Sequence, residues 1–231
     1  MVPLLTGVLA FDQHRAHAHS LAAIVLIAIS GAAAFAFAGE IDPGVGLALG
    51  VGGVVGSTAG AHLMNRLSPN ALRGIFGAIM VGTGVRMAWA GAVESGSQPE
   101  LLAGLSIAVG IGLVAGVASG VAGIGGGVIM VPAMVFLLGM SQHIAEGTSL
   151  MAILFTAVAG TRVNLRNKRV DLRQAAMIGL GGVIFALIGV QLALALSSEV
   201  LTRVFGVFVA LVGIRMIGRL VRDRRRTSVG A

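Results

Sequence analysis

Cysteine is absent from this 231-residue sequence, so disulfide bonds and thiolate chemistry are excluded. Tyrosine is absent too, and charged residues make up only 11%, whereas a soluble domain carries about 25%. What the sequence does contain is apolar: 56% of its residues are hydrophobic and the mean hydropathy is +0.97. Its 36 glycines are typical of membrane helices, where small side chains let backbones approach closely. The composition therefore excludes a soluble domain and predicts a bilayer protein.

Catalytic and nucleotide-binding motifs are also missing. The sequence has no His-Glu-x-x-His, no Ser–His–Asp order on adjacent apolar segments, and no Gly-Lys-Ser/Thr after a glycine run. We expect every carboxylate to fall in a loop or in the tail, which argues against a buried Asp/Glu proton relay. The sequence predicts neither an enzyme nor a cofactor.

The net charge of +7 does not indicate nucleic-acid binding. The basic residues stand in loops beside apolar runs, as the positive-inside rule requires. The arginine cluster at positions 219–226 is typical of a topology anchor that touches anionic lipid headgroups. We therefore expect the lipid bilayer as a partner, and no nucleic acid.

The first half of the chain resembles the second. At an offset of 129 residues, 28 of the first 87 positions carry the same residue as their counterparts, without a gap. Apolar composition raises such a number, but it does not explain matched polar positions such as Gln13 and Gln142, or Asp42 and Asp171. The sequence predicts two homologous halves.

Six apolar segments approach the roughly 20 residues that a bilayer-spanning helix needs. They are Ser20–Ala38, Gly44–Leu63, Leu72–Trp89, Thr148–Leu165, Ala175–Leu196 and Val200–Ile217. Two shorter pieces, Val2–Leu9 and Val128–Gly139, correspond across the repeat and are too short to span alone. Leu101–Ala122 precedes the second of them and is separated from it by a glycine run.

Charge predicts how the halves face. If Leu101–Gly139 forms a re-entrant hairpin, 12 basic loop and tail residues share one side and only Arg203 lies on the other; a crossing hairpin gives 9 against 4. The first arrangement is favoured, and it inverts the two halves. Inverted repeats with interrupted helices are typical of secondary transporters, whose substrates bind where the broken segments meet. The predicted fold is an all-α polytopic membrane protein with two homologous, inverted helical repeats that contain broken or re-entrant helices.

The glycine run is the strongest local signal for a binding site. Gly112, Gly116 and Gly120 share one helix face, a close-packing stripe. Next come Gly125, Gly126 and Gly127, which break the helix before a second one begins. Free N–H groups at the new N-terminus can hold an anion; a tight turn without a ligand is the alternative.

Polar residues after the short helix form the second signal. Gln142, Thr148 and Ser149 introduce a full span, and Gln13 and Ser20 hold corresponding places in the first half. We expect these side chains to contact a substrate, although capping of the span is the favoured interpretation of Thr148. Arg162, in the last turn of its span, either gates an anion path or extends its charge to the headgroups.

Three histidines near the start, His14, His17 and His19, suggest a metal site, because imidazoles are common metal ligands. The second half keeps only His143 in this region. We therefore treat a metal or cation permease as the alternative function and assign no metal site.

At this point the residues carry a family resemblance. Gly120–Pro132, Gly147–Leu150 and the loop residues Val170-Asp171 resemble motifs of the sulfite exporter TauE/SafE family. The likeness covers Leu101–Ile217, and the first half is similar to a weaker duplicate. The resemblance implies a bacterial inner-membrane permease for sulfite, organosulfonates or related sulfur-containing anions.

Family members look as though they carry a glycine-rich broken segment in both halves, whereas this chain starts where the first such segment would just have ended. We favour a start codon assigned too far downstream; the alternative is a protein that lacks half of its central site. The expected division is a first repeat over 1–92, a connecting loop over 93–100, a second repeat over 101–218 and a basic cytoplasmic tail over 219–231.

The leading hypothesis is a secondary transporter for a small anion in a bacterial inner membrane, with a homo-oligomer left open. A truncated membrane paralogue that does not transport is the remaining alternative.

Overall fold

The computed structural model describes residues 13–63, 69–91, 99–122, 126–167 and 170–229, and their side chains within 18–59, 74–89, 91, 99–119, 126–167, 170–220 and at Arg222. The described residues form only helices, connected by short turns. Their bounds are α2 Gln13–Phe37, α3 Pro43–Leu63, α4 Pro69–Ala90, α5 Leu101–Ala122, α6 Gly127–Leu137, α7 Gln142–Arg166, α8 Leu172–Ala195 and α9 Ser198–Val229. The all-α prediction is confirmed.

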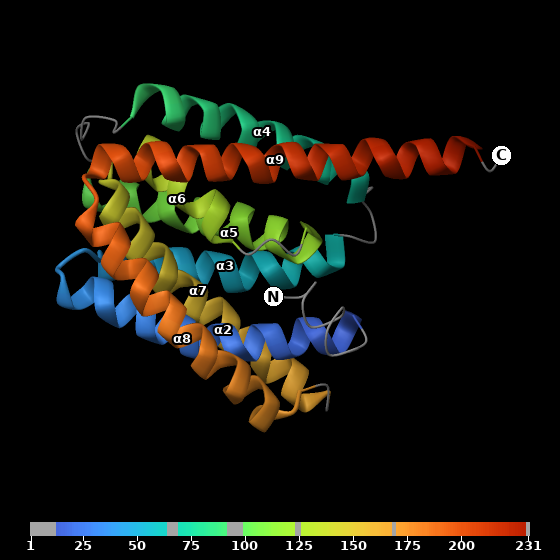
Figure 1. The fold of residues 1–231 in the computed structure, drawn as a ribbon, viewed down its shortest axis with the longest axis horizontal. Helices are drawn as coiled ribbons and strands as arrows, with labels where there is room; N and C mark the ends of the chain where they lie inside the picture. Colours follow the sequence, from blue (N-terminus) through green and yellow to red (C-terminus); the bar gives the residue numbers. More distant parts are fainter. Residues whose placement is uncertain (1–12, 64–68, 92–98, 123–125, 168–169, 230–231) are drawn as a thin grey trace.

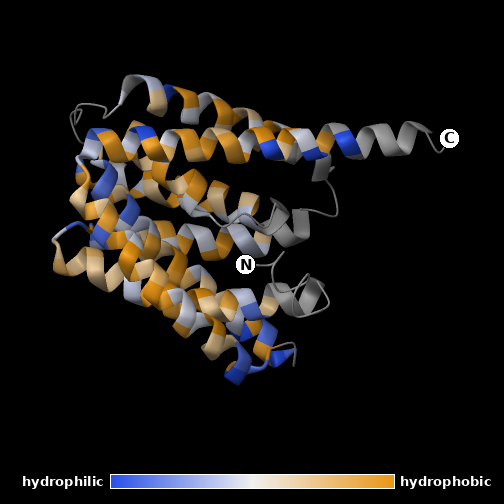
Figure 2. Cartoon of the chain, viewed as in Figure 1, coloured by the Kyte–Doolittle hydropathy of each residue, from blue (hydrophilic) through white to orange (hydrophobic). Residues whose placement is uncertain are grey.

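Five of these helices are long and apolar enough to cross a membrane: the described parts of α2, α5 and α9, and the whole of α7 and α8. The helices lie side by side in one bundle, and the end of α9 projects beyond it (Figure 1). Apolar residues cover the middle of the bundle, and hydrophilic residues gather toward its two ends (Figure 2). This distribution is what a multi-pass protein requires, because a bilayer core does not solvate polar groups.

The two ends differ in charge, and we name them accordingly. The acidic end holds Glu40, Asp42, Glu100 and Glu199, in or beside the turns around 38–42, 99–101, 138–141 and 196–198. The basic end holds Arg166 and Arg173, beside the turn between α7 and α8, and the tail of α9 extends past it.

Two predicted segments agree closely with the structure, whereas α2, α7 and α9 extend beyond their predicted bounds. Leu101–Ala122 is α5 with the same bounds, and Val128–Gly139 corresponds to α6. However, α7 begins at Gln142, six residues before the expected start. Its first turn is polar and gave no apolar signal, yet Gln142 is buried and the Ser141 hydroxyl caps the helix by accepting the N–H of Ile144 at 3.3 Å.

Helices α5 and α6 fold back on each other. Leu101 at the start of α5 and Leu138 just after α6 line the same cavity at the acidic end. Helix α5 therefore starts at the acidic end and α6 returns to it, as the hairpin prediction requires. How deeply the hairpin enters a membrane stays a prediction.

Glycines hold α3 against α5. A Cβ added at Gly52 would clash with the carbonyl oxygen of Val109, and one at Gly112 would clash with that of Leu49. Gly116 meets Gly53 in the same way, with the added Cβ 2.5 Å from the carbonyl oxygen. The predicted close-packing stripe is confirmed at Gly112 and Gly116, while the environment of Gly120 lies outside the described residues.

Contacts between helices repeat when each residue is replaced by its counterpart at the offset of 129 residues. Leu21 packs on Gly160 and Leu150 on Gly31, so α2 and α7 run antiparallel, and exchanging the halves turns one contact into the other. In α4 and α9, Gly84 meets Gly206 and Gly77 meets Gly213, which are also exchanged pairs. The starts of α2, α3 and α4 precede those of α7, α8 and α9 by the same offset. These contacts have the pattern that an inverted duplication would produce, and the duplication itself stays a prediction.

Candidate functional site

The central feature of the candidate site is the start of α6, which lies beside the middle of α5 rather than at an end of the bundle (Figure 1). Gly126 is the N-cap residue, with φ −63° and ψ −24°, and as a glycine it provides no side-chain cap. A Cβ at Gly127 would lie 2.9 Å from Ile153 Cδ1 and 3.9 Å from Ser149 Oγ. The absence of a side chain at Gly127 therefore lets α7 approach the backbone where α6 begins.

Ser149 is the hydroxyl group closest to this point among the predicted site residues. It is buried, and its Oγ donates to the carbonyl oxygen of Glu146 at 2.8 Å. That bond is local to α7, so the hydroxyl proton can rotate toward another acceptor at the α6 N-terminus. The structure thus brings together Gly126, Gly127 and Ser149 of the predicted set; Gly125 lies outside the described residues.

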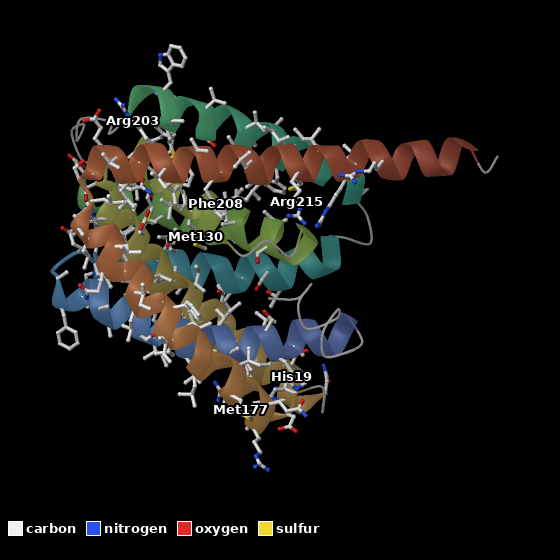
Figure 3. The ribbon with its side chains drawn as sticks, in the orientation of Figure 1. His19, Met130, Met177, Arg203, Phe208 and Arg215 are labelled. Carbon is white, nitrogen blue, oxygen red and sulfur yellow. The ribbon has the colours of Figure 1, made fainter. Side chains whose placement is uncertain are left out.

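Met130 forms the wall behind the site. It is 1% exposed, and Figure 3 shows it in the interior of the bundle. Its Cε would lie 3.1 Å from a Cβ added at Gly126 and 3.5 Å from one added at Gly53, beside Thr156. Residues of α3, α6 and α7 therefore meet around the start of α6.

Thr148 lies on another side of α7 and has a structural role. Its Oγ1 accepts the backbone N–H of Asp42 at 3.0 Å, and the residue is fully buried. The capping interpretation is therefore wrong, because Ser141 occupies the N-cap and Thr148 is in the second turn. Thr148 braces the turn between α2 and α3 against α7.

A matching brace joins the other pair of helices. His19 Nε2 accepts the backbone N–H of Asp171 at 3.2 Å. At the 129-residue offset, His19 corresponds to Thr148 and Asp171 corresponds to Asp42, so the two hydrogen bonds occupy equivalent places. Each aspartate also accepts N–H groups at the start of the next helix: Asp42 from Val45, and Asp171 from Arg173 and Gln174. The matched aspartates therefore position α3 and α8.

Gln142 and Glu146 form a polar pair in the first two turns of α7. Gln142 is 1% exposed, and its Nε2 donates to Glu146 Oε1 at 2.8 Å. Its Oε1 is buried and has no partner in the described part of the chain. The prediction that every carboxylate falls in a loop or tail is wrong for Glu146, because α7 begins before it. Only an earlier predicted start of this helix could have found it.

The remaining predicted residues lie elsewhere. Leu21 packs on Gly160 of α7, so the neighbouring Ser20 lies near the same part of α7. Gly160 is 11 residues beyond Ser149, which corresponds to about 17 Å along the helix. Arg162 is exposed and lines an apolar cavity of about 390 Å³ between α3 and α7. It lies 13 residues beyond Ser149, or about 20 Å along the helix. Gln13 is the first residue of α2, and its side chain is outside the described part.

A second cavity, which sequence reasoning missed, opens at the acidic end. It measures about 360 Å³ and is lined by Asp42, Leu101, Leu105, Leu138 and Ile144, among others. The Arg86 guanidinium on α4 lies 4.5 Å from the centre of the Phe136 ring on α6, a cation–π contact that joins the two helices.

The metal alternative gains no support from the described side chains. No group of three His, Cys, Asp or Glu residues lies together among them. His19 uses Nε2 as an acceptor for Asp171, while the side chains of His14 and His17 are not described. A metal site at these histidines stays a prediction.

Comparison with known proteins identifies the family. The model of the family described as sulfite exporter TauE/SafE matches residues 1–87 and 108–230. The chain belongs to the sulfite exporter TauE/SafE family. The predicted resemblance is confirmed, and the chain is a multi-pass membrane protein of a transporter family.

Three curated relatives of this TauE/SafE chain carry transporter names. "Probable membrane transporter protein YunE" of Bacillus subtilis is 30% identical over 118 residues, or 48% of this chain and 43% of the relative. A "Probable membrane transporter protein" of Xylella fastidiosa strain Temecula1 is 30% identical over 122 residues, covering 52% and 47%. Its counterpart in strain 9a5c is 30% identical over 114 residues, covering 49% and 44%. The aligned part thus spans about half the length of each relative, and no solved structure matches the chain.

Proposed function

We propose that this protein is a secondary permease for small anions, and that sulfite, organosulfonates or related sulfur-containing anions are its substrates. The family description and the relatives' names support transport. The chemistry of the site supports an anion as the substrate. Backbone N–H groups and the positive end of the helix dipole favour negative charge at the start of α6. Sulfite and sulfonate groups offer several oxygen acceptors for such donors.

The observation that carries this proposal is the uncapped start of α6 inside the bundle, with Ser149 against it. Gly126 gives no side-chain cap, and a Cβ at Gly127 would fall 3.9 Å from Ser149 Oγ. A helix start away from the ends of a bundle is tolerated where it is buried in protein or lines a watery cavity. Broken helices with such termini hold substrates in secondary transporters.

The proposal includes an orientation. In a bacterial inner membrane, the positive-inside rule puts the basic end, with Arg166, Arg173 and the C-terminal tail, in the cytoplasm. The cavity beside Asp42 and Leu101 then opens to the other side. The antiparallel contacts of α2 with α7 and of α4 with α9 support an inverted pair of halves, which alternating access uses.

Uptake into proteoliposomes tests the proposal with labelled sulfite and labelled ethanesulfonate. We expect saturable uptake by the wild type of at least one of the two anions. Ser149→Ala should lower it about tenfold, because one hydroxyl donor is lost. Gly127→Leu should abolish it, since a side chain there meets Ile153 at 2.9 Å and fills the space before the N-terminus.

Gly82→Leu is the matched control, because a side chain at Gly82 would meet nothing within 4 Å. It should transport like the wild type. Unchanged flux in Gly127→Leu would remove the start of α6 from the mechanism. Absence of flux in the wild type would favour the non-transporting alternative, and flux of a divalent cation that His14→Ala and His17→Ala abolish would favour the metal alternative.

A further inference from the structure

Glu146 is a carboxyl group inside a candidate membrane span. It belongs to the second turn of α7, and the whole of α7 from Gln142 to Arg166 is long and apolar enough to cross a membrane. Carboxyl groups in such segments are costly to keep charged and are frequently functional. The proposed anion site gives Glu146 no role, because only its backbone carbonyl contacts Ser149.

The hydrogen bonding of the Gln142 side chain bears on the protonation state of the Glu146 carboxyl group. Gln142 Nε2 donates to Glu146 Oε1 at 2.8 Å, and the amide oxygen takes no part in that bond. The amide oxygen is buried and has no partner among the described residues, although buried amide oxygens are nearly always hydrogen-bonded. Leaving such an acceptor unpaired destabilises a structure, so the arrangement calls for a donor next to it.

A proton on Glu146 supplies that donor. A carboxylic acid and a primary amide can form a two-bond pair, in which the amide N–H donates to the carbonyl oxygen and the acid O–H donates to the amide oxygen. The first of these bonds is present between Gln142 and Glu146. An ionised carboxylate has no proton to give and cannot form the second.

We propose that Glu146 holds a proton in this conformation and that its release is coupled to movement of the anion. Release breaks the O–H bond of the carboxyl group; the proton passes to water and the carboxylate keeps the electron pair. The coupling half of this inference rests on the proposed transport function, whereas the protonation half does not.

Other charged groups near Glu146 are few. On its own helix, His143 is adjacent and its Nε2 lies 3.0 Å from the carbonyl oxygen of Ala193 at the end of α8. From the turn between α2 and α3, Glu40 presents its carbonyl oxygen to Gly147, and Asp42 presents its N–H to Thr148. Helix α6 contains no titratable residue.

Helix α9, which also contacts α7, places Glu199 and Arg203 at the same end. The two are exposed and pair with each other at 2.6 Å. No described arginine is therefore placed to hold Glu146 as a carboxylate, since Arg203 is already paired and Arg86 lies over Phe136.

Infrared spectroscopy of the full-length protein in D₂O tests the protonation directly. At neutral pH, the wild type should show a carboxylic-acid carbonyl band that Glu146→Gln lacks. Glu199→Gln, which alters an exposed carboxylate at the same end, should keep the band. Gln142→Met should shift the band to higher wavenumber, because the acid loses its amide partner. If the spectra of the wild type and Glu146→Gln coincide in this region, Glu146 is ionised and the inference is wrong.

Proteoliposomes with an imposed pH gradient test the coupling. The probe is ethanesulfonate, whose sulfonate remains ionised throughout. A gradient of one pH unit should raise wild-type accumulation about tenfold, because one proton that crosses with each anion converts one pH unit into a tenfold concentration ratio. Glu146→Gln should exchange ethanesulfonate across the membrane but not accumulate it, and Glu199→Gln should behave like the wild type. Accumulation by Glu146→Gln equal to that of the wild type, or driven by a sodium gradient instead, would overturn the coupling. If the wild type carries no anion at all, the proposed function fails, and the infrared result still decides whether Glu146 is protonated.

Discussion

Helices α3 and α8 occupy corresponding places in the two halves, but their surroundings differ. In α3, Gly52 lies so close to α5 that a Cβ would clash with the carbonyl oxygen of Val109. Its counterpart in α8, Gly181, has nothing within 4 Å of an added Cβ. The next turn repeats the contrast: Gly56 packs on Leu113, whereas its counterpart Phe185 is 77% exposed.

The difference shows what glycine does in this fold. Where a second helix lies alongside, as α5 does, glycines bring the two backbones into contact, and the packing of the pair depends on them. Only 17% of the apolar stretch of α8 is buried, and large side chains such as Met177, Leu180 and Phe185 cover its surface. The same helical frame therefore carries a helix-packing face in one half and an apolar exposed face in the other.

The largest expected effect comes from filling the two equivalent glycines. Gly52→Leu should destabilise the protein by about 3 kcal/mol, because the side chain meets backbone atoms of α5 that cannot move aside. Gly181→Leu should change stability by less than about 0.5 kcal/mol. Thermal unfolding in detergent micelles measures both. Equal losses in the two variants would show that the exposed face of α8 is covered in the folded protein.

Much of this contrast was predictable from the sequence. The apolar run between Glu100 and the glycine run predicts α5 with its observed bounds, and the four-residue spacing of Gly112 and Gly116 predicts their shared face. Which helix that face would meet was not predictable, because the contact with α3 joins residues about 60 positions apart and depends on the whole bundle.

An intermediate effect is expected at the braces that precede α3 and α8. Thr148→Val should cost about 1.5 kcal/mol, because it leaves the Asp42 N–H without its acceptor in a buried place. His19→Leu should cost less, about 0.5 kcal/mol, since Asp171 is exposed and water can replace the histidine. Unfolding curves of both variants, with Thr148→Ser as the control that keeps the hydroxyl, provide the measurement. A greater loss in His19→Leu would reverse the ranking.

These braces mark a limit of sequence reasoning. The match of Asp42 with Asp171 indicated the duplication but not its role, and Thr148 was assigned to capping or substrate contact. Its bond to Asp42 joins positions 106 residues apart. Glu146 was missed for a related reason: the polar first turn of α7 is helical because its neighbours bury it, not because its sequence is apolar.

The smallest effect is expected on the exposed face of α8. Phe185→Leu should shift the free energy of unfolding by less than about 0.5 kcal/mol, because Phe185 is 77% exposed. The same micelle unfolding assay applies. A loss above about 2 kcal/mol would mean that another protein surface packs there, as happens when a core phenylalanine is shortened.

Opposite orientation of the two halves is most directly tested by labelling single cysteines in intact cells. The sequence contains no cysteine of its own, so Glu40→Cys in the turn between α2 and α3 and Arg173→Cys beside the corresponding turn between α7 and α8 each give one site. A membrane-impermeant maleimide should label Glu40→Cys from outside and reach Arg173→Cys only after the membrane is opened. Labelling of both from the same side would contradict the arrangement.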